Sequence, residues 1–286
     1  MRQSLKRILG EHPEKDRLEA FTFLSDQIQD AGGRKELNLE PISAWQDEID
    51  ERLKYWDKLW GIESGYTSID AMTRGLAPGE MTVIAGKTSY GKTTLALNIT
   101  AKVASEAPVA LVTLEMSKPE VGVRLQQITR SKDLYALPVL VQAQDELDWQ
   151  DVDILFEKAA KADAKLVVID HLHYFTRELE HVAEDLGRVT KEIKKNALRY
   201  NLPVILISHV RKTDKTAGID DLRGSSYIAQ DADIVLMVNR DPETPKKLYV
   251  KLEKNRNRGP KRLEASFDFD GVTLTEPSEY EVDFSQ

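Results

Sequence analysis

The sequence predicts an α/β protein with a mostly parallel central sheet, preceded by a small helical segment. Short apolar, β-branched runs recur along the chain and alternate with stretches of helical spacing, a pattern typical of a parallel sheet covered by helices on both faces. One of these runs, residues 81–85, leads through a glycine-rich loop into a helix. The length of 286 residues and the 41% hydrophobic content suit one large domain with an appendage. We expect a helical extension over residues 1–60 and the main domain over residues 61–286.

The charge is distributed unevenly along the chain. A formal net charge of −8 excludes a uniformly basic surface of the kind that coats nucleic acid. Residues 246–262 nevertheless contain eight Lys or Arg and a single acid, whereas residues 264–286 contain seven acids and no Lys or Arg. Binding to nucleic acid therefore stays open, provided that the basic groups converge on one face or pore.

The composition also bears on the cellular compartment in which the protein works. The chain has no cysteine, so disulfides, thiol nucleophiles and thiolate metal sites are excluded. No apolar run approaches the length of a membrane span, and the first residues lack the apolar core of a signal peptide. We expect a cytoplasmic protein (host cytoplasm if it is phage-encoded) without a membrane partner.

The N-terminal 60 residues contain no phosphate-binding or metal-binding motif. Helical spacing over residues 14–30 ends at Gly32 and Gly33, and Ser43 is placed to open a second helix, with Gln46 in the capping-box position. That helix carries an apolar stripe at intervals of three and four residues, made of Trp45, Ile49, Leu53, Trp56 and Trp60. The stripe packs on its own domain or docks on a neighbouring subunit, and both interpretations remain open.

The main domain shows strand and helix patterns in regular alternation. Residues 66–70 and 76–80, with a turn at Pro78-Gly79, lead into the first strand. The expected strands are residues 81–85, 109–114, 137–141, 166–170, 203–208, 234–238 and 248–252, followed by an edge hairpin over residues 265–274. Two expected helices are marked by apolar residues at helical spacing: Leu95, Ile99 and Val103 in the first, and Val121, Leu125 and Ile128 in the second. Two more are expected over residues 149–162 and 186–200.

The loop after the first strand follows the pattern Gly86-x-x-x-x-Gly91-Lys92-Thr93. Its glycines let backbone N–H groups turn towards a phosphate chain, and the next helix points its positive end at the same charge. In this pattern Lys92 reaches the β- and γ-phosphates and the Thr93 hydroxyl binds Mg²⁺. We therefore predict a site for ATP or another nucleoside triphosphate on Gly86, Lys87, Thr88, Ser89, Tyr90, Gly91, Lys92, Thr93 and Thr94.

Two acids at predicted strand ends are candidates for the chemistry. Asp170 closes a run of four apolar residues, where a carboxylate holds Mg²⁺ opposite Thr93; the alternative is an ordinary acid at a strand end. Glu115 follows the second strand, which we expect to lie next to the loop strand, and is the candidate general base. Glu80 and Glu120 are weaker candidates, because neither ends a buried strand at the edge where ligands bind.

His209 follows the strand at residues 203–208, where a polar side chain can contact the γ-phosphate and respond to its presence. A histidine metal site is the competing interpretation, since His171 and His173 also follow a strand end. The absence of cysteine and of a third ligand at a suitable spacing disfavours that metal site.

Two further basic segments are candidates for phosphate contacts. A long polar loop carries Arg211, Lys212, Lys215, Arg223, Gly224 and Ser226; it either contacts a nucleic-acid backbone or is simply solvated. Lys254 and Arg256 precede a turn and are either surface charges or an arginine finger for the ATP site of the next subunit.

Taken together, residues 61–269 resemble the motor domain of DnaB-type replicative helicases, with relatives in phage primase-helicases and the mitochondrial Twinkle helicase. The Gly86–Thr93 loop is shared by many ATPases. Leu-Glu-Met-Ser at residues 114–117 and Asp-Leu-Arg-Gly-Ser-Ser-Tyr-Ile-Ala-Gln-Asp-Ala-Asp at residues 221–233 are much more specific. Residues 61–70, 168–170, 207–212 and 254–256 extend the resemblance.

The resemblance implies a RecA-like ATPase that forms a hexameric ring around single-stranded DNA, with ATP held between subunits. Glu115 then resembles the catalytic base of the family, Arg124 falls near the nucleotide, and His209 resembles the phosphate sensor of phage-type members. Lys254 and Arg256 resemble cations that reach the neighbouring ATP site. Arg223, Gly224 and Ser226 fall on the DNA-binding loop, and the stripe from Trp45 to Trp60 is similar in placement to the linker helix that joins subunits.

The chain also departs from that family. The 60 residues before Gly61 are too few for the usual helical N-terminal domain plus linker, and we expect a minimal or truncated member. Primase, loader or other replisome partners remain possible on this basis. Two other functions stay open: a recombinase or KaiC-like regulator on the same fold, and an ATP-gated loading or anchoring module that does not unwind DNA.

Overall fold

The computed structural model describes residues 41–54, 59–130, 136–143, 147–172, 182–210, 225–240, 243–257 and 263–277. The chain divides into two units, residues 1–50 and residues 51–286, and each is described by itself. The helix predicted over residues 14–30 and the residues Trp56 and His173 lie outside the described part of the chain. None of the described helices is long and apolar enough to cross a membrane.

The predicted second helix is present but begins differently, and Trp60, the last residue of its predicted stripe, lies outside a helix, with its N–H donating to the Arg74 carbonyl at 3.0 Å. A 3₁₀ turn, η1 (Ile42–Trp45), runs directly into α3 (Gln46–Lys54). The capping box expected from Ser43 is wrong, because Ser43 lies inside the 3₁₀ turn and Pro41 occupies the cap without a side-chain hydrogen bond. Neither η1 nor α3 contains a buried residue, and Trp45 and Leu53 of the apolar stripe are exposed.

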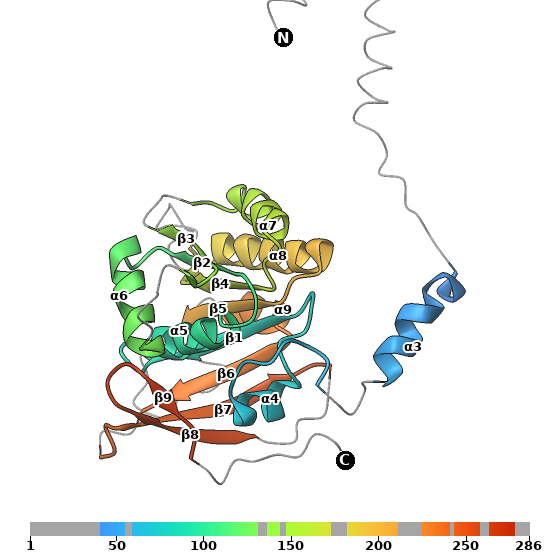
Figure 1. Cartoon of the computed structure of the whole chain (residues 1–286). Helices are drawn as coiled ribbons and strands as arrows, with labels where there is room; N and C mark the ends of the chain where they lie inside the picture. Colours follow the sequence, from blue (N-terminus) through green and yellow to red (C-terminus); the bar gives the residue numbers. More distant parts are fainter. Residues whose placement is uncertain are drawn as a thin grey trace, which may run out of the picture. The chain divides into compact units, whose positions relative to one another are not determined.

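The main domain contains one sheet of nine described strands, in the order β3-β2-β4-β5-β1-β6-β7-β8-β9 (Figure 1). Pairing is parallel from β3 to β6 and antiparallel from β6 to β9. The prediction of a mostly parallel sheet with an edge hairpin at Asp270-Gly271 is confirmed. The strands are β1 (Met81–Gly86), β2 (Val109–Thr113), β3 (Val139–Ala143), β4 (Leu166–Asp170), β5 (Val204–His209), β6 (Ile234–Asn239), β7 (Lys247–Asn255), β8 (Glu264–Phe269) and β9 (Leu274–Thr275).

Helices cover both faces of the sheet, because alternate residues of the buried strands point to opposite sides. In β1, Ile84 belongs to one apolar cluster with residues of α4, α5 and α6, whereas Val83 belongs to a second cluster with residues of α7, α8 and α9. The described helices are α4 (Thr67–Thr73), α5 (Lys92–Val103), α6 (Lys118–Thr129), α7 (Asp151–Lys161), α8 (Val182–Tyr200) and α9 (Ser225–Asp231).

Two of these helices were not predicted. Helix α4 occupies residues that we expected only to lead into β1. Helix α9 begins at Ser225, so Ser226 lies in a helix rather than in the predicted polar loop. Both helices have seven residues, too few for a helical period to stand out in the sequence.

The strand order corrects one expectation about the site. Strand β2 pairs with β3 and β4, and β1 pairs with β5 and β6, so the strand before Glu115 is not next to the loop strand. Strands β4 and β5 lie between them. The parallel strands still end at a common edge, which we call the carboxyl edge; the opposite side, where they begin, is the amino edge.

Candidate functional site

The phosphate-loop motif lies at the carboxyl edge, between β1 and α5. A side chain at Gly86 would meet the Val238 carbonyl oxygen at 2.5 Å, and Gly91 has a φ of 94°, in the left-handed region that favours glycine. Gly91 occupies the N-cap of α5, whose apolar residues Leu95 and Ile99 are buried as predicted. The backbone therefore turns tightly in front of the positive end of a helix, a geometry that receives phosphate groups.

Lys92 and Asp170 are the buried charges of this site. Lys92 Nζ donates to the Lys87 carbonyl oxygen at 2.9 Å, across the loop. Burial lowers the pKa of Lys92 to about 8, against the opposing effect of the Asp170 and Glu115 charges. Burial, with a further contribution from Glu115, raises the pKa of Asp170 to about 6. A lysine and a carboxylate are thus both held in a poorly solvated pocket.

Asp170 and Thr93 fit the magnesium site predicted from the sequence. The Thr93 hydroxyl lies close enough to lower the pKa of Asp170. Both carboxylate oxygens of Asp170 are buried, and neither has a well-aligned hydrogen-bond donor in the described part of the chain. Buried carboxylate oxygens of this kind beside a hydroxyl suit a hard cation such as Mg²⁺.

Glu115, His171 and His209 meet at the same edge from three different strands. Glu115 Oε1 lies 3.1 Å from His171 Nδ1 and 3.9 Å from His209 Nε2, and the two imidazole rings lie edge-to-face with centroids 4.4 Å apart. One ligand atom from each residue lies within 4.8 Å of the others, so Glu115 is the third candidate ligand that the sequence did not reveal. The same arrangement can orient the Glu115 carboxylate towards a reacting water.

The weaker candidates for the general base have other partners. Glu120 Oε2 accepts hydrogen bonds from the Ser117 N–H at 2.7 Å and from the Ser117 hydroxyl at 2.8 Å, in the capping box of α6. Glu80 precedes β1 at the amino edge and accepts a hydrogen bond from Asn257 Nδ2 at 3.0 Å. Neither carboxylate lines the pocket at the phosphate loop.

That pocket joins the residues of the carboxyl edge. Its lining includes the predicted Arg124, which comes from α6. Sequence reasoning missed Arg240 and Phe269, whose guanidinium and ring lie 4.8 Å apart at the same pocket. Arg240 directly follows β6, in the same way that Asp170 ends β4. The reasoning that singled out polar residues at the ends of predicted strands could therefore have found Arg240 if it had been applied to β6. The lining is Thr88, Ser89, Gly91, Lys92, Thr93, Thr94, Glu115, Met116, Arg124, His209, Arg240 and Phe269.

Lys254 and Arg256 lie at the amino edge instead. The Arg256 N–H donates to the Asp233 carbonyl at 2.8 Å, and the Asp233 N–H donates to the carbonyl of Met81, the first residue of β1. The phosphate loop begins at the other end of β1, about 17 Å away over five residue steps of ~3.3 Å. This span exceeds the reach of an arginine side chain, so Arg256 cannot meet a phosphate bound on its own loop.

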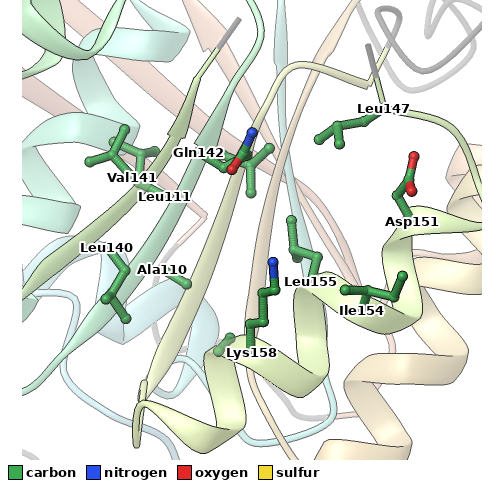
Figure 2. Close-up of a pocket in the computed structure, with 12 residues that line it drawn as sticks. Ala110, Leu111, Leu140, Val141, Gln142, Leu147, Asp151, Ile154, Leu155 and Lys158 are labelled. Atoms are coloured by element: carbon green, nitrogen blue, oxygen red, sulfur yellow. The ribbon is translucent and has the colours of Figure 1, made fainter. Parts of the chain in front are cut away.

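A separate apolar groove lies between β2, β3 and α7 (Figure 2), and it shares no lining residue with the pocket at the phosphate loop. Leu140 and Ile154 border it and are both exposed. Its polar residues are Gln142, Asp151 and Lys158, of which Asp151 accepts a hydrogen bond from the Asp148 N–H at 2.9 Å. Its lining carries none of the residues that we expected to act in chemistry.

The predicted DNA loop lies mostly outside the described residues. This applies to Arg211, Lys212, Lys215, Arg223 and Gly224, and of Ser226 only the helical backbone is described.

The family model described as DnaB-like helicase C terminal domain matches residues 61–129 and 123–273. The chain belongs to this family. The replicative DNA helicase DnaB of Leifsonia xyli subsp. xyli is 25% identical over 273 residues, which cover 82% of this chain and 59% of that protein. The chain therefore spans little more than half the length of this curated relative.

Two solved structures share the fold. One, described as an ATPase domain, has a TM-score of 0.72 and 21% identity, covering 84% of this chain and all of that one (100%). The other, a DnaB-like replicative helicase described with its interactions with primase, has a TM-score of 0.69 and 19% identity, covering 96% of this chain and 75% of that one. The predicted RecA-like α/β fold is confirmed.

Proposed function

We propose that this DnaB-like chain is the motor of a ring-forming DNA helicase, which hydrolyses ATP between subunits to move along single-stranded DNA and unwind duplex. The observation that carries the proposal is the separation of the phosphate loop from Lys254 and Arg256, at opposite edges of one sheet. Two cations that cannot reach their own nucleotide suit a site completed by a neighbour. A head-to-tail contact forms a ring when the rotation between neighbours closes, and we propose a closed, hexameric ring.

In this proposal the carboxyl edge binds the nucleotide. The backbone of the loop and Lys92 hold the phosphates, and Arg124 adds positive charge from α6. Thr93 and Asp170 would hold Mg²⁺, which neutralises phosphate charge when bound. Phe269 and Arg240 offer a ring and a planar cation on which a nucleobase can stack.

Glu115 then acts as the general base on the attacking water. Its carboxylate reaches into the pocket and contacts His171 Nδ1, which helps to fix its orientation. His209 lies beside the same carboxylate and is placed to respond to the γ-phosphate. Loss of that phosphate changes the contacts of His209 and of the neighbour's cations, which provides a route from hydrolysis to movement.

The partner is single-stranded DNA, bound through Arg211, Lys212, Lys215, Arg223, Gly224 and the start of α9. The acidic net charge confines such binding to a local basic surface. We further propose a cytoplasmic location and contact with a replisome protein such as primase, which the DnaB-like structure named above is described with. The exposed Trp45 and Leu53 of η1 and α3 suit docking on a neighbouring subunit.

The proposal is tested by ATPase activity with and without single-stranded DNA, together with strand displacement on a forked duplex. We expect DNA to stimulate hydrolysis and ATP to drive displacement. Arg223→Ala should weaken DNA binding and reduce its salt dependence, while nucleotide binding is kept. Slow hydrolysis that ignores DNA would favour the loading or anchoring module, and strand exchange without displacement would favour a recombinase.

A further inference from the structure

Lys254 and Arg256 are both held on the last turn of α9. Lys254 Nζ donates to the carbonyls of Ala229 at 2.6 Å and Ala232 at 2.7 Å, and Arg256 Nη2 donates to the Gln230 carbonyl. The last carbonyls of a helix lack partners within the helix and carry its negative dipole end. The end of α9 is therefore a favourable support for two adjacent cations that would otherwise repel each other.

Asp233 adds a fixed counter-charge beside that helix end. It is 3% exposed, and its Oδ2 accepts hydrogen bonds from the Met81 N–H at 2.8 Å and from Lys194 Nζ at 2.6 Å. Its Oδ1 lies 3.8 Å from Arg256 Nη1, and its carbonyl accepts the Arg256 N–H at 2.8 Å. Because Met81 begins a central strand, the carboxylate cannot move without disturbing the sheet.

The outer side of this assembly is open. The Arg256 side chain is 47% exposed, although it is held at its backbone and at two of its nitrogens. A group that acts on another molecule must be both held in place and accessible. Arg256 combines these two properties.

We propose that Asp233 is a positioning residue for a neighbouring subunit's ATP site, because it and the end of α9 orient Arg256 and Lys254 towards that site. The inference rests on the shared site proposed above. Asp233 touches no nucleotide and acts through Arg256. Preorganisation of this kind matters because misplacing a transition-state contact by about 1 Å costs roughly 100-fold in rate.

The test is complementation in mixed rings. Asp233→Asn keeps an acceptor for the Met81 N–H but removes the charge beside Arg256. We expect ATPase activity to fall roughly 10- to 100-fold while ATP still binds. Asp233→Asn and Lys92→Ala are mixed in equal amounts. Some interfaces then combine the intact phosphate loop of an Asp233→Asn subunit with the intact cations of a neighbouring Lys92→Ala subunit. About a quarter of the interfaces should be of this kind, so the mixture should regain up to that share of wild-type activity.

Three comparisons make the result decisive. Arg256→Ala mixed with Lys92→Ala tests the shared site alone; failure of both mixtures overturns the shared site and this inference with it. Recovery with Arg256→Ala but not with Asp233→Asn leaves the shared site standing and overturns only the positioning role. Full activity of Asp233→Asn by itself overturns the role as well. Asp70→Asn is the matched control, since Asp70 is also buried and accepts a backbone N–H, from Ser64 at 2.9 Å.

Loss of charge at Asp233 also leaves Lys194 without its carboxylate, which threatens folding. The double variant Asp233→Asn with Lys194→Met removes that uncompensated charge and keeps the change beside Arg256. Complementation by either form supports the proposal. If the Arg256→Ala mixture recovers activity but neither Asp233 variant complements Lys92→Ala, the proposal is overturned. This holds whether or not the Asp233 variants bind nucleotide.

Discussion

The two edges of one sheet carry cations that are held in different ways. At the carboxyl edge Lys92 is buried, turned onto its own loop and close to two acids. At the amino edge Arg256 is half exposed, tied to Asp233 and to the end of α9. The first arrangement suits a ligand bound by this chain, whereas the second presents a charge outwards. This difference is what the proposed division of the site between two subunits predicts.

The largest expected effects separate the two cations. Lys92→Ala should abolish both nucleotide binding and hydrolysis, because it removes the buried positive charge of the phosphate loop. Arg256→Ala should lower hydrolysis by roughly 10³-fold or more, as for an arginine finger, while ATP still binds. Binding of a fluorescent ATP analogue and steady-state ATPase activity measure the difference. Full ATPase activity of oligomeric Arg256→Ala would remove the distinction between the edges.

The next effect concerns the base at the carboxyl edge. Glu115→Gln should lower the hydrolysis rate by about 10²- to 10⁴-fold, because the amide cannot accept the proton of the attacking water. Nucleotide affinity should change little. Glu120→Gln is the control, since Glu120 caps α6 and should affect only stability. Equal losses in the two variants, measured in single-turnover hydrolysis, would contradict the role of Glu115.

A smaller effect is expected at the rim of the pocket. Phe269→Ala should weaken ATP binding about tenfold by removing a stacking surface for the base. The affinity for inorganic triphosphate, which has no base, should stay the same. Calorimetric titration with both ligands makes the comparison, and an equal loss for both would show that the ring only supports the phosphate loop.

The smallest effect lies away from both edges. Burial raises the pKa of Asp70 to about 7, so its protonated form is favoured by folding. That contribution to stability is complete below the pKa of about 4 in the unfolded chain and is lost as the pH rises through 7. The Tm of Asp70→Asn minus the Tm of the wild type should therefore be a few degrees larger at pH 8 than at pH 5. A Tm difference independent of pH would contradict this, and unchanged ATPase activity would validate the variant as the control for Asp233→Asn.

The elements of the central sheet follow from local patterns. Apolar β-branched runs can bury both faces of a strand, and the residues from Gly86 to Thr93 specify a loop whatever the rest of the chain does. The first strand was accordingly predicted close to its observed bounds, and α5 follows the loop and contains the predicted apolar residues. The same patterns do not state which strands pair, and β2 was therefore wrongly expected beside β1.

The sequence by itself thus determined the phosphate-loop motif, the strand-end acid Asp170 and an α/β sheet, because each depends on neighbours in the chain. Only the tertiary structure brought His171 and His209 to Glu115, added Phe269 and Arg240 to the pocket, and put Arg256 at the far edge on Asp233. Strand order and direction decide these contacts. Both depend on packing between residues far apart in sequence, which a periodic pattern does not encode.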